Sequence, residues 1–151
     1  MKNIFTILAL TIGFSVNAQD FWFQGTAADA IQTANATASG WYSTAMGYGT
    51  IAYGHYSTAM GLDTTADGGN STAMGEFTIA RGNYSTAMGR STEAFGDYST
   101  AMGYGTEASD YASLVIGQYN SSGSSVTNSA TVFNTANTAF VIGNGTNSSN
   151  T

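Results

Sequence analysis

Cysteine and proline are absent from this sequence of 151 residues, and charged side chains make up only 8% of it. Without cysteine, the chain has no disulfide, no thiolate metal ligand and no thiol nucleophile. The chain has a single histidine, His55, so few catalytic arrangements that use histidine are possible. Glycine, alanine, serine and threonine dominate instead, a composition unlike that of an average globular enzyme or of a highly charged disordered tail.

The segment 1–18 has the pattern of a secretory signal peptide. Lys2 supplies a positive charge, an apolar run spans 4–14, and Val16-Asn17-Ala18 resembles a cleavage site. The run is too short for a stable transmembrane helix, although a buried N-terminal helix is an alternative. We predict export, with a mature chain that begins at Gln19. Its two basic residues and nine acidic residues give a formal charge of −7 (2 − 9), which disfavours binding to nucleic acids or anionic lipids.

A five-residue phrase, STAMG, begins at Ser43 and recurs at a constant interval of fourteen residues through Ser99; the next step reaches Ser113 and the related phrase SLVIG. A constant period this short predicts a solenoid with one turn of the coil per repeat. Seven residues after each serine, a second phrase begins at a threonine, as in TIAYG from Thr50. Both phrases share the frame Ser/Thr-x-Ala-x-Gly, which Asp110 breaks in the last copy.

The period of two within each phrase predicts two short strands per coil, joined by two-residue turns at glycine-bearing ends. The x positions of the second strand include Asp67, Arg81 and Glu93, and unpaired charges do not fit a dry interior. Those positions should face solvent, which leaves the Ser/Thr and Ala positions to face inward. Two linking residues span only about 10 Å at roughly 3.3 Å per residue, so the two walls of the coil should lie close together.

The outward positions of the first strand do not vary among the five STAMG copies, unlike those of the second strand. They form a Thr/Met stripe that ends in a leucine and an isoleucine: Thr44, Met46, Thr58, Met60, Thr72, Met74, Thr86, Met88, Thr100, Met102, Leu114 and Ile116. A constant apolar stripe, on a coil with almost no apolar interior, predicts burial against another chain. The alternative places Thr and Met inside a thicker tube.

The S-x-A-x-G frame, its spacing and the signal peptide together resemble the head repeats of trimeric autotransporter adhesins, the YadA-like family. The resemblance covers 39–117, with a fragment at 138–145 (TAFVIGNG). It implies an all-β, left-handed parallel β-roll, a homotrimer packed through the Thr/Met stripe, and adhesion to host matrix, cells or surfaces. The Thr/Met pair departs from the family's usual apolar β-branched pair. The family's stalk and membrane anchor do not follow in this sequence, so we expect attachment to the bacterial cell surface and outer membrane through an anchor outside this chain.

The two ends of the chain fit the repeat poorly. We expect an N-terminal cap over 19–38, in which Phe21, Trp22 and Phe23 cover the open end of the roll; an aromatic sugar site is the alternative. The coils should span 39–117. A polar insertion or loop should occupy 118–137, and a partial repeat with a frayed tail should occupy 138–151.

Sequence signals for catalysis or metal binding are weak. His55 lies at a variable turn position, and the serines lie in inward positions with no histidine nearby in the pattern. The segment Asp63–Asn70 (DTTADGGN) has a faint likeness to a calcium loop but lacks the established signatures. We therefore expect no catalysis, no metal and no cofactor.

The leading functional prediction is an exported adhesive head that makes weak, multivalent contacts. Its candidate ligand contacts are Tyr53, Arg81 and Phe95 on the second strand, together with the turn tyrosines, which alternatively stack as a simple ladder. Three other functions remain open: an ice-binding solenoid with exposed threonine ranks, a non-enzymatic fibre segment of a phage or cell-surface appendage, and a β-helical glycan-cleaving enzyme.

Overall fold

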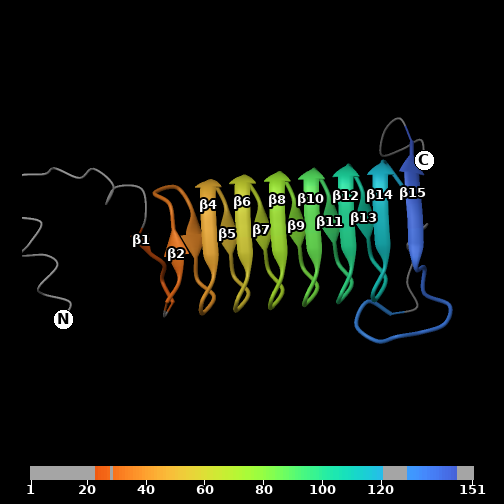
Figure 1. Ribbon diagram of the computed structural model, residues 1–151, viewed down its shortest axis with the longest axis horizontal. Coiled ribbons are helices and arrows are strands. Elements are labelled where there is room, and N and C mark those ends of the chain that lie inside the picture. Colours follow the sequence, from red (N-terminus) through yellow and green to blue (C-terminus); the bar gives the residue numbers. More distant parts are fainter. Residues whose placement is uncertain (1–22, 28, 121–128, 146–151) are drawn as a thin grey trace, which may run out of the picture.

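A computed structural model describes residues 23–27, 29–120 and 129–145, and within them the chain is entirely strands, turns and loops. The strands form two facing parallel sheets wound as a single solenoid (Figure 1). The predicted all-β parallel solenoid is therefore confirmed, whereas its handedness and its trimeric state remain predictions. The proposed signal peptide lies outside the described residues.

The first wall is a sheet of nine strands, mostly five residues long, which we call the long-strand sheet. In spatial order its members are β1 (Phe23–Gln24), β2 (Ile31–Gln32), β4 (Thr44–Tyr48), β6 (Thr58–Leu62), β8 (Thr72–Glu76), β10 (Thr86–Arg90), β12 (Thr100–Tyr104), β14 (Leu114–Gln118) and β15 (Phe140–Asn144). Among these described strands, only the β1–β2 pair is antiparallel.

The second wall is a sheet of six two-residue strands, the short-strand sheet. Its members are β3 (Thr37–Ala38), β5 (Ile51–Ala52), β7 (Thr65–Ala66), β9 (Ile79–Ala80), β11 (Glu93–Ala94) and β13 (Glu107–Ala108). Each coil contributes one strand to each wall, as the two phrases of the repeat predict.

The register of both ladders equals the sequence period. Thr72 pairs with Thr86 and Met74 with Met88, so each STAMG phrase lies directly on the next. Backbone hydrogen bonds join the coils at the strand entrances, such as Thr72 N to Ser85 O at 2.9 Å. One turn of the coil therefore takes exactly one repeat of the sequence, as predicted.

Alanine fills the interior. In every coil from β4 to β13 the alanine at the centre of each phrase is completely buried, as are the leading serines and threonines, and Val115 is the largest fully buried side chain. The inward orientation of the Ser/Thr and Ala positions is therefore confirmed. Because alanine buries little apolar surface, the backbone ladders rather than a hydrophobic core carry the fold of a single coil.

Most interior hydroxyl groups are buried without a hydrogen-bond partner. Thr78 is typical: its residue is 0% exposed and its Oγ1 has no partner in the structure. An unsatisfied buried hydroxyl is destabilising, and its replacement by an apolar group of the same shape removes the cost of desolvating it. Ser43 and Ser113, at the leading position of their phrases, do have a partner, since each Oγ donates to the carbonyl oxygen three residues earlier. The desolvation cost therefore applies to the hydroxyls that lack such a bond.

We expect Thr78→Val to raise the free energy of unfolding by about 1 kcal/mol, because valine keeps the β-branched shape and removes the unsatisfied oxygen. The midpoint of chemical denaturation measures this change. Thr65→Val, at a half-buried outward position, is the matched control and should change stability little. A clear loss of stability in Thr78→Val would show that the hydroxyl has a partner.

Glycine serves two different purposes at the two strand ends. At the end of the first phrase, Gly61 has a φ of 123°, and a Cβ there would also overlap Gly75 O. At the end of the second phrase, Gly54 has no such φ, but a Cβ would overlap Gly68 O in the next coil. Both ends therefore require glycine, as predicted, although only the first requires it for its backbone conformation.

Both ends of the solenoid extend beyond the perfect repeats. Within the segment predicted as a cap, β2 and β3 already join the two sheets, with Thr37 paired to Ile51. The predicted covering role of the aromatic residues falls on 21–22, outside the described residues, and on the Phe23 side chain, which is not described. At the other end, β15 pairs with β14 at an offset two residues short of two full coils, with Val141 beside Val115. The division of the chain into the five predicted segments remains a prediction.

A side chain closes the short-strand sheet at its C-terminal edge. Asn120 accepts a hydrogen bond from Glu107 N at 2.7 Å and donates one from Nδ2 to Glu107 O at 2.9 Å. The amide thus reproduces the pair of bonds that a further strand would make with β13. Asn120 is 8% exposed, so the edge is satisfied without leaving an open template for pairing.

Candidate interaction surfaces

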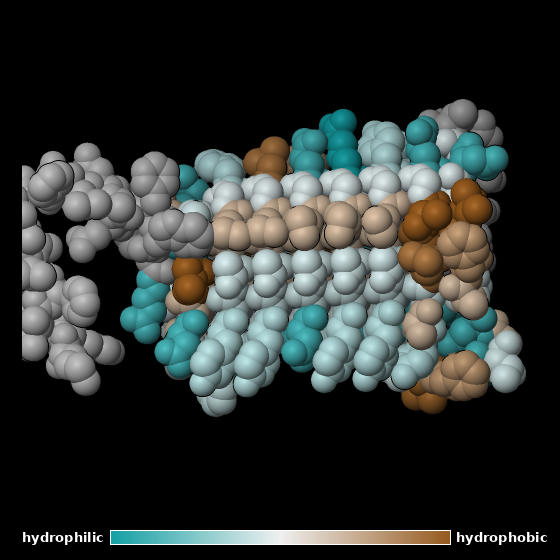
Figure 2. All heavy atoms as spheres, viewed as in Figure 1, coloured by the Kyte–Doolittle hydropathy of each residue, from teal (hydrophilic) through white to brown (hydrophobic). Residues whose placement is uncertain are grey.

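The Thr/Met stripe forms an uncharged outer surface on the long-strand sheet. Thr44, Met46 and their equivalents are half-buried, whereas Met102 and Leu114 are 38% and 37% exposed. Their partial burial comes from stacking along the ladder, because identical side chains repeat at the strand spacing of about 4.8 Å. Figure 2 shows two unbroken pale rows across this face, with hydrophilic residues gathered at its margins.

The stripe becomes more apolar toward its C-terminal end. There the column of threonines continues as Leu114 and Phe140, and the column of methionines as Ile116 and Ile142. Phe140 and Ile142 are 53% and 66% exposed. The structure thus brings together all twelve residues predicted for the interface, and it adds two that sequence reasoning did not include because they lie outside the regular period.

One margin of the Thr/Met stripe carries charged residues. It contains the last residue of each long strand, including Glu76, Arg90 and Tyr104. Arg90 Nε lies 3.2 Å from Glu76 Oε2, and the guanidinium lies 5.6 Å from the Tyr104 ring centre. The hydrogen bond between the Tyr104 and Tyr119 side chains raises the pKa of Tyr119 above its usual value. At these residues the margin is polar and internally paired, in contrast to the stripe beside it, whereas Leu62 in the same column is an apolar side chain that is 38% exposed.

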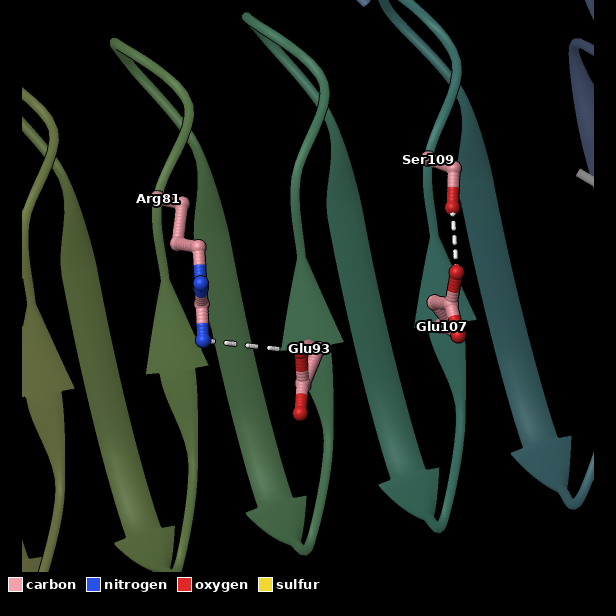
Figure 3. A network of polar contacts seen from close by, with 4 residues as sticks. All are labelled: Arg81, Glu93, Glu107 and Ser109. Carbon is pink, nitrogen blue, oxygen red and sulfur yellow. Dashed lines mark hydrogen bonds and ion pairs between the residues drawn. The ribbon is translucent and has the colours of Figure 1, made fainter. Parts of the chain in front are cut away.

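The outer wall of the short-strand sheet carries the predicted ligand contacts. The Arg81 guanidinium lies 4.9 Å from the centre of the Phe95 ring. It also lies 4.0 Å from Glu93 Oε2, and Ser109 Oγ donates to Glu107 Oε1 at 2.6 Å (Figure 3). Arg81 and Phe95 lie in adjacent coils and form one pair. Tyr53 is 53% exposed and lies two coils from Arg81, so the structure does not join it to the pair.

The turns before the long strands form a third surface, which we call the turn edge. Tyrosine occupies the same position in four coils and makes two stacked pairs, Tyr42–Tyr56 and Tyr84–Tyr98, with ring centres 5.2 and 4.9 Å apart. Asn70 takes this position in the coil between the pairs. The ladder interpretation of the turn tyrosines is thus correct within each pair, and about half of each tyrosine's surface remains exposed.

The residues before Tyr56, Tyr84 and Tyr98 cap the turn of the preceding coil. His55 Nδ1 accepts from Trp41 N at 3.0 Å, Asn83 Oδ1 accepts from Gly69 N at 3.0 Å, and Asp97 Oδ1 accepts from Asn83 N at 2.7 Å. The position is variable in sequence because several side chains can supply the same acceptor. His55 therefore has a local structural role at an exposed turn.

Several of the alternatives weighed from the sequence find no support in the part of the chain that the structure describes. The serines of the repeat, such as Ser57 and Ser71, are at most 1% exposed and cannot reach a substrate. No group of three or more His, Cys, Asp or Glu residues is arranged to hold a metal ion among the described residues. The same residues include no helix long and apolar enough to cross a membrane. The ice-binding alternative calls for exposed ranks of threonine. The threonines that lead the second phrase are buried, so only the threonine column beside the methionines faces outward.

The YadA head domain repeat, a family model made of two copies of the repeat, matches residues 34–50, 38–64, 52–78, 66–92, 80–106 and 94–120. The chain belongs to the YadA head family. Its matched segments coincide with the coils of the solenoid, most of them covering two successive turns of the YadA head repeat. Neither a curated protein nor a solved structure matches the chain. The matched region is thus a YadA-like head of the kind found in trimeric autotransporter adhesins.

Proposed function

We propose that this chain is the head of an exported, non-catalytic adhesin, that it assembles as a homotrimer through the Thr/Met stripe, and that it attaches a bacterial surface to host matrix, cells or other surfaces. The observation that carries the proposal is the uncharged stripe that runs unbroken over β4 to β14. YadA head membership supports the adhesin role. Export follows from the predicted signal peptide.

The energetics of a single coil favour assembly. The interior of each coil is alanine with buried hydroxyls, so folding of one chain removes little apolar surface from water. The largest apolar side chains of the repeat, the methionines, remain only half-buried on the outside. Packing three stripes against one another supplies the burial that the solitary coil lacks, because binding of a partner to the folded state stabilises it.

The shape of the stripe suits a closed symmetric assembly. It is straight, repeats with the coil period and keeps its charges at the margins, which matches an interface with an apolar centre and a polar rim. In a trimer, each copy would present the short-strand sheet and its variable side chains outward. Arg81, Phe95 and Tyr53 would then be repeated three times around the head, and such multiplicity strengthens weak contacts.

Two measurements on the purified mature chain test the proposal. Light scattering should give a mass three times that of the chain, and a stable monomer at micromolar concentration would contradict the proposed assembly. Beads coated with the trimer should adhere to surfaces carrying extracellular matrix proteins more strongly than uncoated beads. Trimers that adhere to no tested matrix or cell surface would remove the adhesive part of the proposal.

A further inference from the structure

A hollow lies where the tyrosines of the turn edge end. Ala112 occupies the position that Tyr98 holds one coil earlier, with a φ of 56° against 61° for Tyr98. Its backbone N donates to Asp97 O at 2.8 Å, as Tyr98 N donates to Asn83 O at 2.8 Å. Ala112 therefore keeps the backbone of a tyrosine position but presents only a methyl group. The Tyr111 ring packs beside Tyr98 instead, and a hollow remains next to the Ala112 methyl group.

The loop 129–139 lies below β14 and β15 in Figure 1, and its residues from Phe133 to Ala139 supply most of the lining of the hollow. Its attachment continues the capping pattern of the turn edge: Ala130 O accepts from Asp97 N at 2.7 Å, where the earlier turns use a side chain. Ser129 O accepts from Tyr111 N at 3.0 Å. The buried carboxylate of Asp110 accepts from Thr138 N at 2.7 Å. The walls of the hollow are thus held by hydrogen bonds at both ends of the loop.

The hollow has a volume of about 300 Å³, at the small end of the range for ligand sites. Two aromatic rings, amide groups, hydroxyl groups and small side chains line it: Tyr111, Ala112, Phe133, Asn134, Thr135, Asn137, Thr138 and Ala139. Tyr111 is itself packed edge-on against Tyr98, with ring centres 5.3 Å apart, so one wall is fixed to the tyrosine position of the previous coil.

We propose that this hollow binds one pyranose ring of a neutral glycan. A sugar ring has apolar C–H faces that pack on aromatic rings and hydroxyl groups that bond to protein hydroxyls. The lining offers the rings of Tyr111 and Phe133 and the hydroxyls of Tyr111, Thr135 and Thr138. The asparagine amides of the lining already bond to the loop backbone through Asn134 Oδ1 and Asn137 Nδ2. No charged side chain lines the hollow, and the chain carries a formal charge of −6, so an acidic sugar or another anion is disfavoured.

The proposal goes beyond the adhesive role by naming the chemistry of one partner. The hollow belongs to the turn edge rather than to the Thr/Met stripe, so it does not require the trimer. A trimer would present three such hollows at the same level of the head, and a branched or repeating glycan would then gain from multivalency.

Saturation-transfer NMR on the purified chain, with the methyl glycosides of glucose, galactose, mannose and N-acetylglucosamine as probes, tests this site. We expect signal transfer to at least one of them. Ala112→Tyr adds a second ring beside that of Tyr111, on a backbone that already suits tyrosine, and by filling the hollow it should abolish the transfer. Phe133→Ala removes a stacking wall and should weaken binding roughly tenfold. Asn70→Tyr completes the other gap on the turn edge and should leave binding unchanged.

Three results would overturn the proposal: no transfer to any of the four glycosides, undiminished transfer in Ala112→Tyr, or transfer only to p-cresol or to a sialyl glycoside used as comparison probes. Circular dichroism establishes that each variant is folded, and Phe133→Ala, at an exposed rim position, supplies a second readout if Ala112→Tyr fails to fold. Light scattering on the same samples separates this test from the assembly test, because trimers that bind no sugar would refute only the glycan site.

Discussion

Met74→Glu is expected to convert the assembled head into monomers. Met74 lies in β8, at the middle of the Thr/Met stripe, with identical methionines beside it on both neighbouring strands. Symmetry brings one new carboxylate per chain into the interface, and an unpaired buried charge costs several kcal/mol. Light scattering should show the mass fall from three chains to one. The melting temperature should fall as well, because the folded monomer loses the stabilisation that its partners provide.

Thr65→Glu is the matched control, since it adds the same charge to the outer wall in a neighbouring coil. Its column on the short-strand sheet already carries Glu93 and Glu107 in register with one another, so this wall tolerates carboxylates. Thr65→Glu should remain a trimer, and so should Met74→Leu, which keeps the apolar character. A trimeric Met74→Glu, or a monomeric Thr65→Glu, would assign the interface to a different face.

Most of the fold could be predicted from the repeat in the sequence. Because each STAMG phrase lies on the next, the spacing from Ser71 to Ser85 is also the register of the ladder. Charges at positions such as Arg81 and Glu93 were sufficient to orient the second strand, since a thin interior without partners cannot hold them. The first strand was oriented only by the frame that the two phrases share. The alternative with threonine and methionine inside stayed open in the sequence, and the structure excludes it because the alanines of that strand are buried.

The turn conformations were not predictable from the pattern. Tyr56 and Tyr84 have a φ of 58°, a region that usually favours glycine or asparagine, and sequence reasoning assigned unusual angles only to glycines. The local strain is offset by contacts between coils. Tyr56 N donates to Trp41 O at 2.8 Å, and its ring stacks on Tyr42. Those partners lie one coil away, so a search for local turn signals misses them.

The contacts at the C-terminal end of the solenoid could not be predicted for a related reason. Asp110 stood out in the sequence only because it breaks the glycine frame, and its function depends on Thr138, 28 residues later. Asn120 closes β13 through a side chain that no repeat position resembles. Each of these residues acts once, at the place where the period fails, so periodicity contains no information about its partner. The glycan hollow depends on Ala112 and the loop 129–139. For the same reason, it could not be predicted from the repeat.

Gly75→Ala is expected to destabilise the head more than any other single methyl group added to this coil. Gly75 ends the STAMG phrase of β8 with a φ of 124°, a conformation that side-chain-bearing residues rarely adopt. The added Cβ would also overlap Gly89 O in the next strand, so the two central strands would have to separate. Backbone strain and overpacking together predict a loss of about 3 to 5 kcal/mol in the free energy of unfolding. Denaturant titration followed by circular dichroism measures it.

Gly69→Ala supplies the control within the same coil. Gly69 has an ordinary backbone conformation, and the nearest atom to an added Cβ is the end of a side chain, Asn83 Oδ1, at 3.2 Å. We expect a change within about 0.5 kcal/mol, because the entropy lost by the unfolded chain offsets the small adjustment of Asn83. Equal effects of the two substitutions would mean that glycine is retained in STAMG for a reason other than the close approach of successive coils. A large loss confined to Gly75→Ala would show that the backbone conformation and the close approach of successive coils together require glycine at this position of the repeat.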